Sequence, residues 1–581
     1  MTEAFWKILG LYDPNWSTRI AVHYGLFGGA IYGQGTDEQR ELYAEDIQTL
    51  RIVGCFAMTE LGHGSFVRGI ETTATYDIPT QQFIINTPTE TATKWWIGGA
   101  AHTCTHSVVF AQLYIKGKNY GVHSFICQLR NKDGSTCEGI EIGDCGLKMG
   151  RQGVDNGWIK FHNVAVPRDN MLMRWAKVSP TGEYSKPPKA QLSYGALIAG
   201  RVSLISGSAD IMKKALTIAV RYSAVRTQFP KKSDEDNDEN TDAIHPKESG
   251  EEQILNYQSH QYRLMPLLAG TYAFHFAAMQ INATYDDMMA DIESEALENL
   301  PETHATAAGL KAFTTWWAQK GLEQCRQCLG GHGYSAYSAL PGMLSDFGVM
   351  VTWEGDNTVM AQQNARFLVK KYREAKGGKR LTGFMKYLSD YIHGNTPNIS
   401  LSIYRMEDLY DPQTQLEIHK KWAAALIVRA CDRLDTESWN DCMMDLIQAS
   451  EAHCYYYVLS CFADRIKNIA DINIGRAMKR LADLFALENM EQHLGNLLRE
   501  AVLHPSHAKL IQVAKMRVIA SVRKEAVPLV DAFNYPDFML SPLGRYDGDI
   551  YTHYFEMVRR APNSQGIAPY FKKFISPLIN G

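Results

Sequence analysis

Several features that mark common protein classes are missing from this sequence. No uninterrupted apolar run approaches the roughly 20 residues that a membrane-spanning helix needs, and residues 1–7 lack the basic and then apolar form of a secretory signal. Residues 25–35 are rich in glycine but do not form G-x-G-x-x-G, and no P-loop, H-E-x-x-H or G-x-S-x-G motif occurs. We therefore expect an intracellular protein without membrane insertion, in which no Rossmann turn holds a dinucleotide.

The sequence also lacks a dense set of cysteines and a net positive charge. Eleven cysteines in 581 residues form no dense framework, which favours reduced thiols over a disulfide scaffold. The formal net charge of -4 gives no reason to expect a nucleic-acid partner. Cys325, Cys328 and His332 have a spacing that could supply three zinc ligands, but no second pair lies nearby and residues i and i+3 share a helix face anyway. We expect no metal site.

The pattern of apolar and polar residues changes along the chain. The first fifty residues are helical in pattern, and Thr36 precedes two acidic residues as a helix-capping residue does. Short β-branched and aromatic segments separated by turn residues then predict an antiparallel sheet or barrel. These segments lie at residues 72–76, 83–85, 106–111, 122–126 and 157–161.

Helical periodicity returns after Pro187 and Pro188. One buried stripe is predicted from residues three or four apart: Val202, Ile205, Ala209, Met212, Leu216 and Ala219. Residues 231–252 hold nine Asp or Glu and predict a solvated loop or, alternatively, an acidic docking segment. A stretch with Gly377, Gly378, Gly394 and Pro397 indicates a linker into a last helical domain.

These patterns predict an α+β protein with a central antiparallel β domain followed by two mainly helical domains. The expected boundaries are 1–53 for an N-terminal helical segment, 54–185 for the β-barrel-like domain, 190–378 for the first of the two helical domains and 400–578 for the C-terminal one.

Two glycine-containing segments of the predicted β domain are candidates for ligand contacts. Residues 55–65 contain Thr59, whose hydroxyl could face a polar ring, although the segment could equally just turn the chain. Residues 94–101 place two tryptophans beside Gly98, which fits either a flat ligand packed on an indole or a plain core cluster. The residues alone leave both pairs of alternatives open.

A third candidate joins residues 330–334 to residues 353–359. Glu354 follows the apolar run 349–353, so a carboxylate stands at the end of a hydrophobic segment. Such a position favours a raised pKa and a usable general base. A glutamate in a loop can also be simply solvated.

Six segments occur in the order and approximate spacing of the acyl-CoA oxidases, and the chain resembles that family from near Thr18 almost to its end. They are CFAMTELGHGSFVRGIETTATYD, KWWIGG, DNGW, RYSAVRTQ, GGHGY and EGDNTV. Residues 531–533 and 544–548 also resemble segments of the second helical domain, which the smaller acyl-CoA dehydrogenases usually lack. The likeness is strongest to fungal-type members and implies the acyl-CoA dehydrogenase/oxidase fold.

The resemblance implies FAD in the crevice between the β domain and residues 190–378, and a homodimer or higher oligomer. The matching cofactor positions are Thr59 and Gly98 at the flavin, Arg226 and Gln228 at the phosphate and ribose side, often from a second subunit, and Gly330 and Gly331 along the adenosine half.

The resemblance also implies the reaction. Glu354 matches the catalytic base that removes the α-proton of a fatty acyl-CoA while the β-hydrogen leaves as hydride, which gives trans-2-enoyl-CoA. Because Gly98 has no side chain, we expect room for O2 near the flavin, so that hydrogen peroxide forms.

The sequence departs from the family pattern in two ways. Most of the N-terminal helical domain is expected to be missing, and residues 577–581 are not a Ser-Lys-Leu address, so a peroxisomal location is the family expectation. The alternatives are an acyl-CoA dehydrogenase that uses an electron-transfer flavoprotein and a non-catalytic acyl-CoA-binding subunit.

Overall fold

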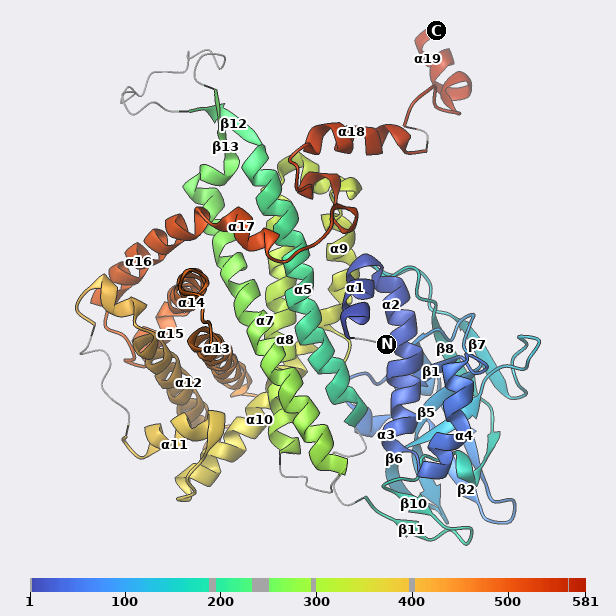
Figure 1. Ribbon diagram of the computed structural model, residues 1–581. Helices are drawn as coiled ribbons and strands as arrows, with labels where there is room; N and C mark the ends of the chain where they lie inside the picture. Colours follow the sequence, from blue (N-terminus) through green and yellow to red (C-terminus); the bar gives the residue numbers. More distant parts are fainter. Residues whose placement is uncertain are drawn as a thin grey trace.

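The computed structural model describes residues 3–187, 195–231, 250–293, 299–395, 403–562 and 564–580. Pro188, Pro397 and residues 232–249 of the acidic segment lie outside these ranges. Figure 1 shows long helices in the centre, strands at the lower right and the N-terminal helices between them.

The N-terminal segment is helical, as predicted. Its elements are α1 (Glu3–Tyr12), α2 (Pro14–Ile20), the π-helical turn η1 (Ala21–Gly28), α3 (Gly29–Gln34) and α4 (Asp37–Gln48). The Thr36 hydroxyl accepts a hydrogen bond from the N–H of Gln39, and the Gln39 side chain accepts one from the N–H of Thr36. This capping box confirms the predicted helix start. Phe27 of η1 is fully buried against Gly54, which joins this segment to the strands.

The strands form a six-stranded and a three-stranded sheet, with β10 and β11 as a separate pair. The first contains β1 (Gly54–Ala57), β2 (Thr73–Asp77), β3 (Gln82–Asn86), β5 (His106–Ile115), β6 (Lys118–Gln128) and β9 (Val164–Pro167). The second has the order β4 (Lys94–Gly98), β8 (Asn156–Phe161), β7 (Ile140–Asp144). The short pair is β10 (Lys177–Val178) with β11 (Tyr184–Ser185).

The fold class is confirmed, with one correction to the sheet. β1 and β2 both pair with β5 in parallel, one after the other along the same edge, while β6 pairs antiparallel with the opposite edge of β5. The sheet is therefore mixed rather than purely antiparallel. Alternation of side chains sets which face of a strand is buried but does not encode the direction of its neighbour.

The central helices pack against one another beside the strands. They are α5 (Gly195–Val225), α7 (Gln258–Glu293), α8 (Leu300–Cys328), α9 (Leu340–Phe347) and α10 (Asn357–Lys376), and the short strands β12 (Thr227–Pro230) and β13 (Glu251–Gln253) follow α5. All six residues of the predicted stripe on α5 are buried, which confirms it.

Helix α7 is long and apolar. Among the residues that the structure describes, Gln258–Ile292 is the one helix long and apolar enough to cross a membrane by length and composition. Its apolar window of 18 residues has a mean hydropathy of 1.2. However, 67% of this window is buried inside the protein, where α7 packs against α5, α8, α13 and α14. Burial of this kind is typical of a core helix.

The remaining helices are α11 (Lys386–Ile392), α12 (Pro412–Leu434), α13 (Met443–Lys467), α14 (Ile472–Gln492), α15 (Leu494–Arg499), α16 (Ser506–Arg523), α17 (Ala526–Asp531), α18 (Ile550–Arg560) and α19 (Ser576–Asn580). Helices α12 to α16 lie on the outer side of α7, whereas α17 packs mainly on α5, and α18 and α19 extend away at the upper right of Figure 1. Arg221 of α5 donates to the carboxylate of Asp531 at 2.8 Å and to the carbonyl oxygen of Gly544 at 2.9 Å. The two C-terminal segments with a family resemblance therefore anchor this end of the chain to α5.

Candidate active site

Glu354 lies in the tight turn between η9 (Gly348–Val351) and α10. Its φ of 55° is in the left-handed region, and φ of the following Gly355 is 105°. Asp356 then caps α10 by accepting hydrogen bonds from the N–H groups of Thr358 and Val359. The apolar run that ends at residue 353 thus delivers the carboxylate into a strained turn, a conformation that persists only where surrounding contacts hold it.

The carboxylate itself is enclosed by protein. Its Oε2 is buried and accepts no hydrogen bond from the described residues. A Cβ placed on Gly200 of α5 would lie 2.7 Å from this oxygen, so the carboxylate packs directly on the bare Cα of the glycine. Burial raises the pKa of Glu354, while the charges of Arg201 and Lys311 oppose that rise. The raised pKa predicted from the sequence is confirmed.

Two buried cations hold the backbone of the turn. Arg201 Nε donates to the carbonyl oxygen of Glu354 at 3.1 Å, and Lys311 Nζ donates to that of Gly355 at 2.6 Å. Arg201 Nη1 also lies 3.0 Å from Nε2 of His304, whose pKa burial lowers to about 4. The N–H groups of Glu354 and Gly355 donate no hydrogen bond to any described residue, so they remain available as donors.

Arg151 connects this turn to other parts of the fold. Its guanidinium lies 4.7 Å from the ring centre of Trp353, next to the base. The same side chain donates to the carbonyl oxygens of Asp346, before η9, and Pro14, at the start of α2. The loop between β7 and β8, the N-terminal segment and the turn therefore meet at one buried arginine.

Thr59 and Gly98 lie on neighbouring segments of the strand region. Thr59 is half-buried just after β1, its carbonyl oxygen accepts from the N–H of Trp95 at 2.9 Å, and its hydroxyl has no hydrogen-bond partner in the described part of the chain. A Cβ on Gly98 would lie 3.2 Å from Cγ2 of Val22 and 3.7 Å from Cγ1 of Val154. Val22 therefore borders the space that a side chain at Gly98 would enter, and room for O2 near the flavin stays a prediction.

Thr59, Gly98 and Glu354 form what we call the carboxylate cluster. Val22 belongs to η1, which contacts both β1 and α5, and Gly200 of α5 touches Glu354. The three predicted residues thus lie on segments joined through η1 and the N-terminal part of α5.

Arg226, Gln228, Gly330 and Gly331 form a second group, the arginine cluster. Arg226 follows the C-terminus of α5 and its Nη1 donates to the hydroxyl of Tyr551 on α18 at 3.2 Å. Gln228 is exposed on β12, and the two glycines open the 3-10 turn η7 (Gly330–Tyr334), where a Cβ would meet nothing within 4 Å. This group is brought together at the far end of α5 and α8.

The two clusters are far apart within one chain. Gly200 and Val225 are 25 residues apart on the unbroken helix α5, which is roughly 38 Å at about 1.5 Å per residue. Glu354 and Arg226 therefore lie at opposite ends of α5 within one chain.

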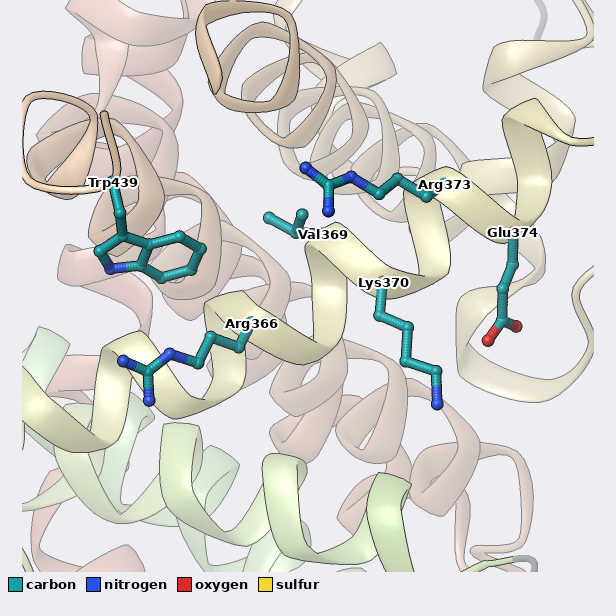
Figure 2. Close-up of a pocket in the computed structure, with 6 residues that line it drawn as sticks. All are labelled: Arg366, Val369, Lys370, Arg373, Glu374 and Trp439. Atoms are coloured by element: carbon teal, nitrogen blue, oxygen red, sulfur yellow. The ribbon is translucent and has the colours of Figure 1, made fainter. Parts of the chain in front are cut away.

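A surface cavity of about 530 Å³ lies elsewhere, on the outer side of α10. It is lined by Arg366, Val369, Lys370, Arg373, Glu374 and Trp439. Figure 2 shows that its three cationic side chains extend in different directions, so their charges do not converge on one point. It contains no predicted site residue.

The cysteines form no disulfide bonds. All eleven cysteines are free, and Cys325 and Cys328 are buried in α8. Among the described residues, no group of three or more His, Cys, Asp or Glu side chains is placed to hold a metal ion.

Comparison with known proteins identifies the family. Residues 194–369 match the family model of the acyl-CoA oxidase C-alpha1 domain, residues 411–580 match that of acyl-CoA oxidase, and residues 55–164 match the middle domain of acyl-CoA dehydrogenases. The chain is 39% identical over 581 residues to peroxisomal acyl-coenzyme A oxidase 1 of Rattus norvegicus, covering 98% of this chain and 86% of the relative. The chain belongs to the acyl-CoA oxidase family.

Solved structures agree with this assignment. Acyl-CoA oxidase 1 of Yarrowia lipolytica superposes with a TM-score of 0.92 at 39% identity. The match covers 100% of this chain and 86% of the Yarrowia chain. Acyl-CoA oxidase-2 of Caenorhabditis elegans, solved with FAD, ascaroside-CoA and ATP, gives 0.88 at 32% identity, with coverage of 97% and 83%. The family is one of oxidases, so the resemblance is to these rather than to dehydrogenases that use an electron-transfer flavoprotein.

Proposed function

We propose that this chain is a FAD-dependent acyl-CoA oxidase that converts a fatty acyl-CoA to trans-2-enoyl-CoA and transfers the electrons to O2, which yields hydrogen peroxide. The observation that carries the proposal is the Glu354 carboxylate, whose Oε2 is buried without a hydrogen bond and whose pKa is raised by burial. An unpartnered base of this kind is ready to accept a proton from a substrate that enters the site.

The residues of the carboxylate cluster fit a flavin and a thioester. The free hydroxyl of Thr59 offers a partner to a polar ring, and the unpaired N–H groups of Glu354 and Gly355 offer donors to a thioester oxygen. When bound, FAD supplies the acceptor for the hydride and passes the electrons on to O2.

The chain's own part in the reaction is to prepare and accept a proton. Donors on the turn stabilise negative charge on the thioester oxygen, which makes the α-hydrogen more acidic. Glu354 then takes that proton on its carboxylate. Water is excluded from Oε2, so the carboxylate is not stabilised by solvent and remains basic.

The test compares Glu354→Gln with a matched control. Glu451 on α13 also has a pKa raised by burial, to about 7, but belongs to neither cluster. We expect Glu354→Gln to bind FAD and to lose about 10²- to 10⁴-fold in anaerobic flavin reduction by acyl-CoA and in peroxide release. Glu451→Gln should keep both activities. Full activity of Glu354→Gln would overturn the assignment of the base.

We further propose that the active unit is a homodimer in which the arginine cluster of one chain completes the carboxylate cluster of the other. The separation along α5 supports this arrangement, because Glu354 and Arg226 lie roughly 38 Å apart along that helix in a single chain. Exposed aromatic side chains on and after α18 also support a covering partner: Tyr551, Phe555, Tyr570 and Phe574.

A complementation experiment tests the shared site. Glu354→Gln and Arg226→Ala are each expected to be inactive alone. Mixed dimers would contain one site with both residues intact, so about a quarter of wild-type activity should return after random reassociation. If both residues served the same site from one chain, mixing would restore nothing.

The names of the relatives support a peroxisomal location, and we propose it for this chain. A fluorescently tagged full-length protein should coincide with a peroxisomal marker in cells. A diffuse signal beside correctly imported marker would contradict it.

A further inference from the structure

Lys311 is a buried cation that the proposed reaction does not use directly. It is fully buried in the middle of α8, and its Nζ donates to the carbonyl oxygen of Gly355 at 2.6 Å and to Oδ1 of Asn357 at 2.8 Å. Its neighbours along the helix are apolar and buried: Ala307, Ala308, Leu310, Ala312 and Phe313. Burial lowers the pKa of Lys311 to about 8.

Lys311 differs from the other fully buried lysines of the described chain. Lys94 is paired with Glu60 at 3.1 Å, and Lys515 is paired with Glu488 at 2.5 Å. No described carboxylate forms a salt bridge with Lys311, whose acceptors are neutral oxygens. An ammonium buried without an ion pair costs free energy, and a neutral donor would satisfy the same two oxygens more cheaply. The stability of the fold therefore does not explain the positive charge of Lys311.

The hydrogen bonds of Lys311 converge on the turn that carries the base. Asn357 is fixed in turn, because its Nδ2 donates to the carbonyl oxygen of Ala312 and to Oγ1 of Thr315. The first residue of α10 is thereby locked to α8 next to Gly355. A change at Lys311 would release the left-handed turn at Glu354, whose conformation depends on such contacts.

The charge of Lys311 also acts on the carboxylate. The charged groups that influence Glu354 are Arg201 from α5 and Lys311 from α8, with Asp356 close by on the same turn. His304, which contacts Arg201, is neutral near pH 7 because burial lowers its pKa to about 4. Two cations thus offset part of the penalty that burial places on the charged base.

We propose that Lys311 is a positioning residue of the oxidase reaction, which fixes the Glu354–Gly355 turn and keeps the buried carboxylate ionised at the pH of turnover. The inference rests on the proposed role of Glu354 as the base. It assigns to Lys311 no contact with the substrate.

The first experiment measures the pH dependence of anaerobic flavin reduction by acyl-CoA. In Lys311→Met we expect the rate to fall about tenfold or more. We also expect the acid limb of the pH profile, the range in which the rate falls as the base becomes protonated, to move up by about one pH unit, because the base loses a nearby positive charge. Lys311→Gln keeps a hydrogen-bond donor without the charge, so its limb should move equally while its rate falls less. Lys515→Met, a matched buried-lysine control far from the turn, should lose thermal stability but keep the wild-type limb.

The second experiment needs neither flavin nor turnover. Thermal unfolding midpoints of the wild type, Lys311→Met, Glu354→Gln and the double variant form a double-mutant cycle. We expect Glu354→Gln to stabilise the Lys311→Met background more than the wild-type background at neutral pH, since the unscreened carboxylate is then more costly to bury. Lys311→Gln replaces Lys311→Met in the cycle if the latter does not fold.

Additive midpoints together with an unmoved acid limb would overturn the role of Lys311. That result is distinguishable from failure of the proposed function. In the latter case the wild-type holoprotein itself would show no flavin reduction with acyl-CoA, whereas the unfolding cycle would still report the coupling between Lys311 and Glu354.

Discussion

Gly200 is the position where the smallest change should separate catalysis from folding. In Gly200→Ala the new Cβ would lie 2.7 Å from both Cδ and Oε2 of Glu354, whereas ordinary contact begins near 3.4 Å. The carboxylate must therefore retreat by about 0.7 Å, and a displacement approaching 1 Å can cost about 10²-fold in rate. We expect a loss of that order in acyl-CoA-dependent flavin reduction.

The stability of Gly200→Ala should move the other way. Gly200 lies inside α5, where alanine is favoured over glycine by roughly 0.5–1 kcal/mol. The three atoms nearest to the new Cβ all belong to the carboxyl group at the end of the Glu354 side chain, so we expect little of that gain to be lost. The thermal unfolding midpoint should be equal to or above that of the wild type, which excludes misfolding as the cause of lost activity.

Gly207, seven residues further along the same helix, is the matched control. A Cβ there meets nothing within 4 Å. Gly207→Ala should thus gain stability and keep full activity. Wild-type activity in Gly200→Ala would refute the reasoning, because it would mean that the position of the carboxylate does not limit the reaction.

Three further predictions follow from burial and close packing. Burial raises the pKa of Glu354, so the native state keeps this carboxyl group protonated at pH values above its ordinary pKa of 4.5. Stability is therefore lost as the pH rises through the raised pKa. Glu354→Gln should raise the unfolding midpoint at pH 7 but not below about pH 4. His419 and His453 are buried with pKa values lowered to about 4, so stability should fall as pH drops from 6.5 to about 4, by on the order of 3 kcal/mol for each, as urea titrations across that range would measure. Gly98→Ala should weaken FAD retention by pressing on Val22 at 3.2 Å, and the added change Val22→Ala should restore it; if the double variant retains no more FAD than the single one, the contact is not the cause.

Local patterns predicted from the sequence were reliable where one helix or strand determines them. The capping residue Thr36 and the buried stripe on α5 depend only on spacing along the chain, and both are confirmed. The raised pKa of Glu354 followed from an apolar run that ends in a carboxylate, and burial in the structure supplies the cause.

The contacts that the sequence did not reveal depend on tertiary packing. Arg201 and Lys311 stand 153 and 43 residues before the base, and nothing in their spacing indicates that they hold the same turn. A signal for Lys311 was present, since a single lysine interrupts the otherwise non-polar run 307–313 of a helix. Val22 against Gly98 gave no such signal, because the segments that meet there are far apart in sequence.

Arg151 has a consequence for how variants of this protein would behave. Its stacking on Trp353 and its bonds to Pro14 and Asp346 tie the base to segments that belong to neither cluster. A substitution at this junction would transmit a small tilt of the strand region directly to the proton acceptor. Such a variant would show a lowered rate of proton removal in an assay, although the cause would be a displaced base and not a changed one.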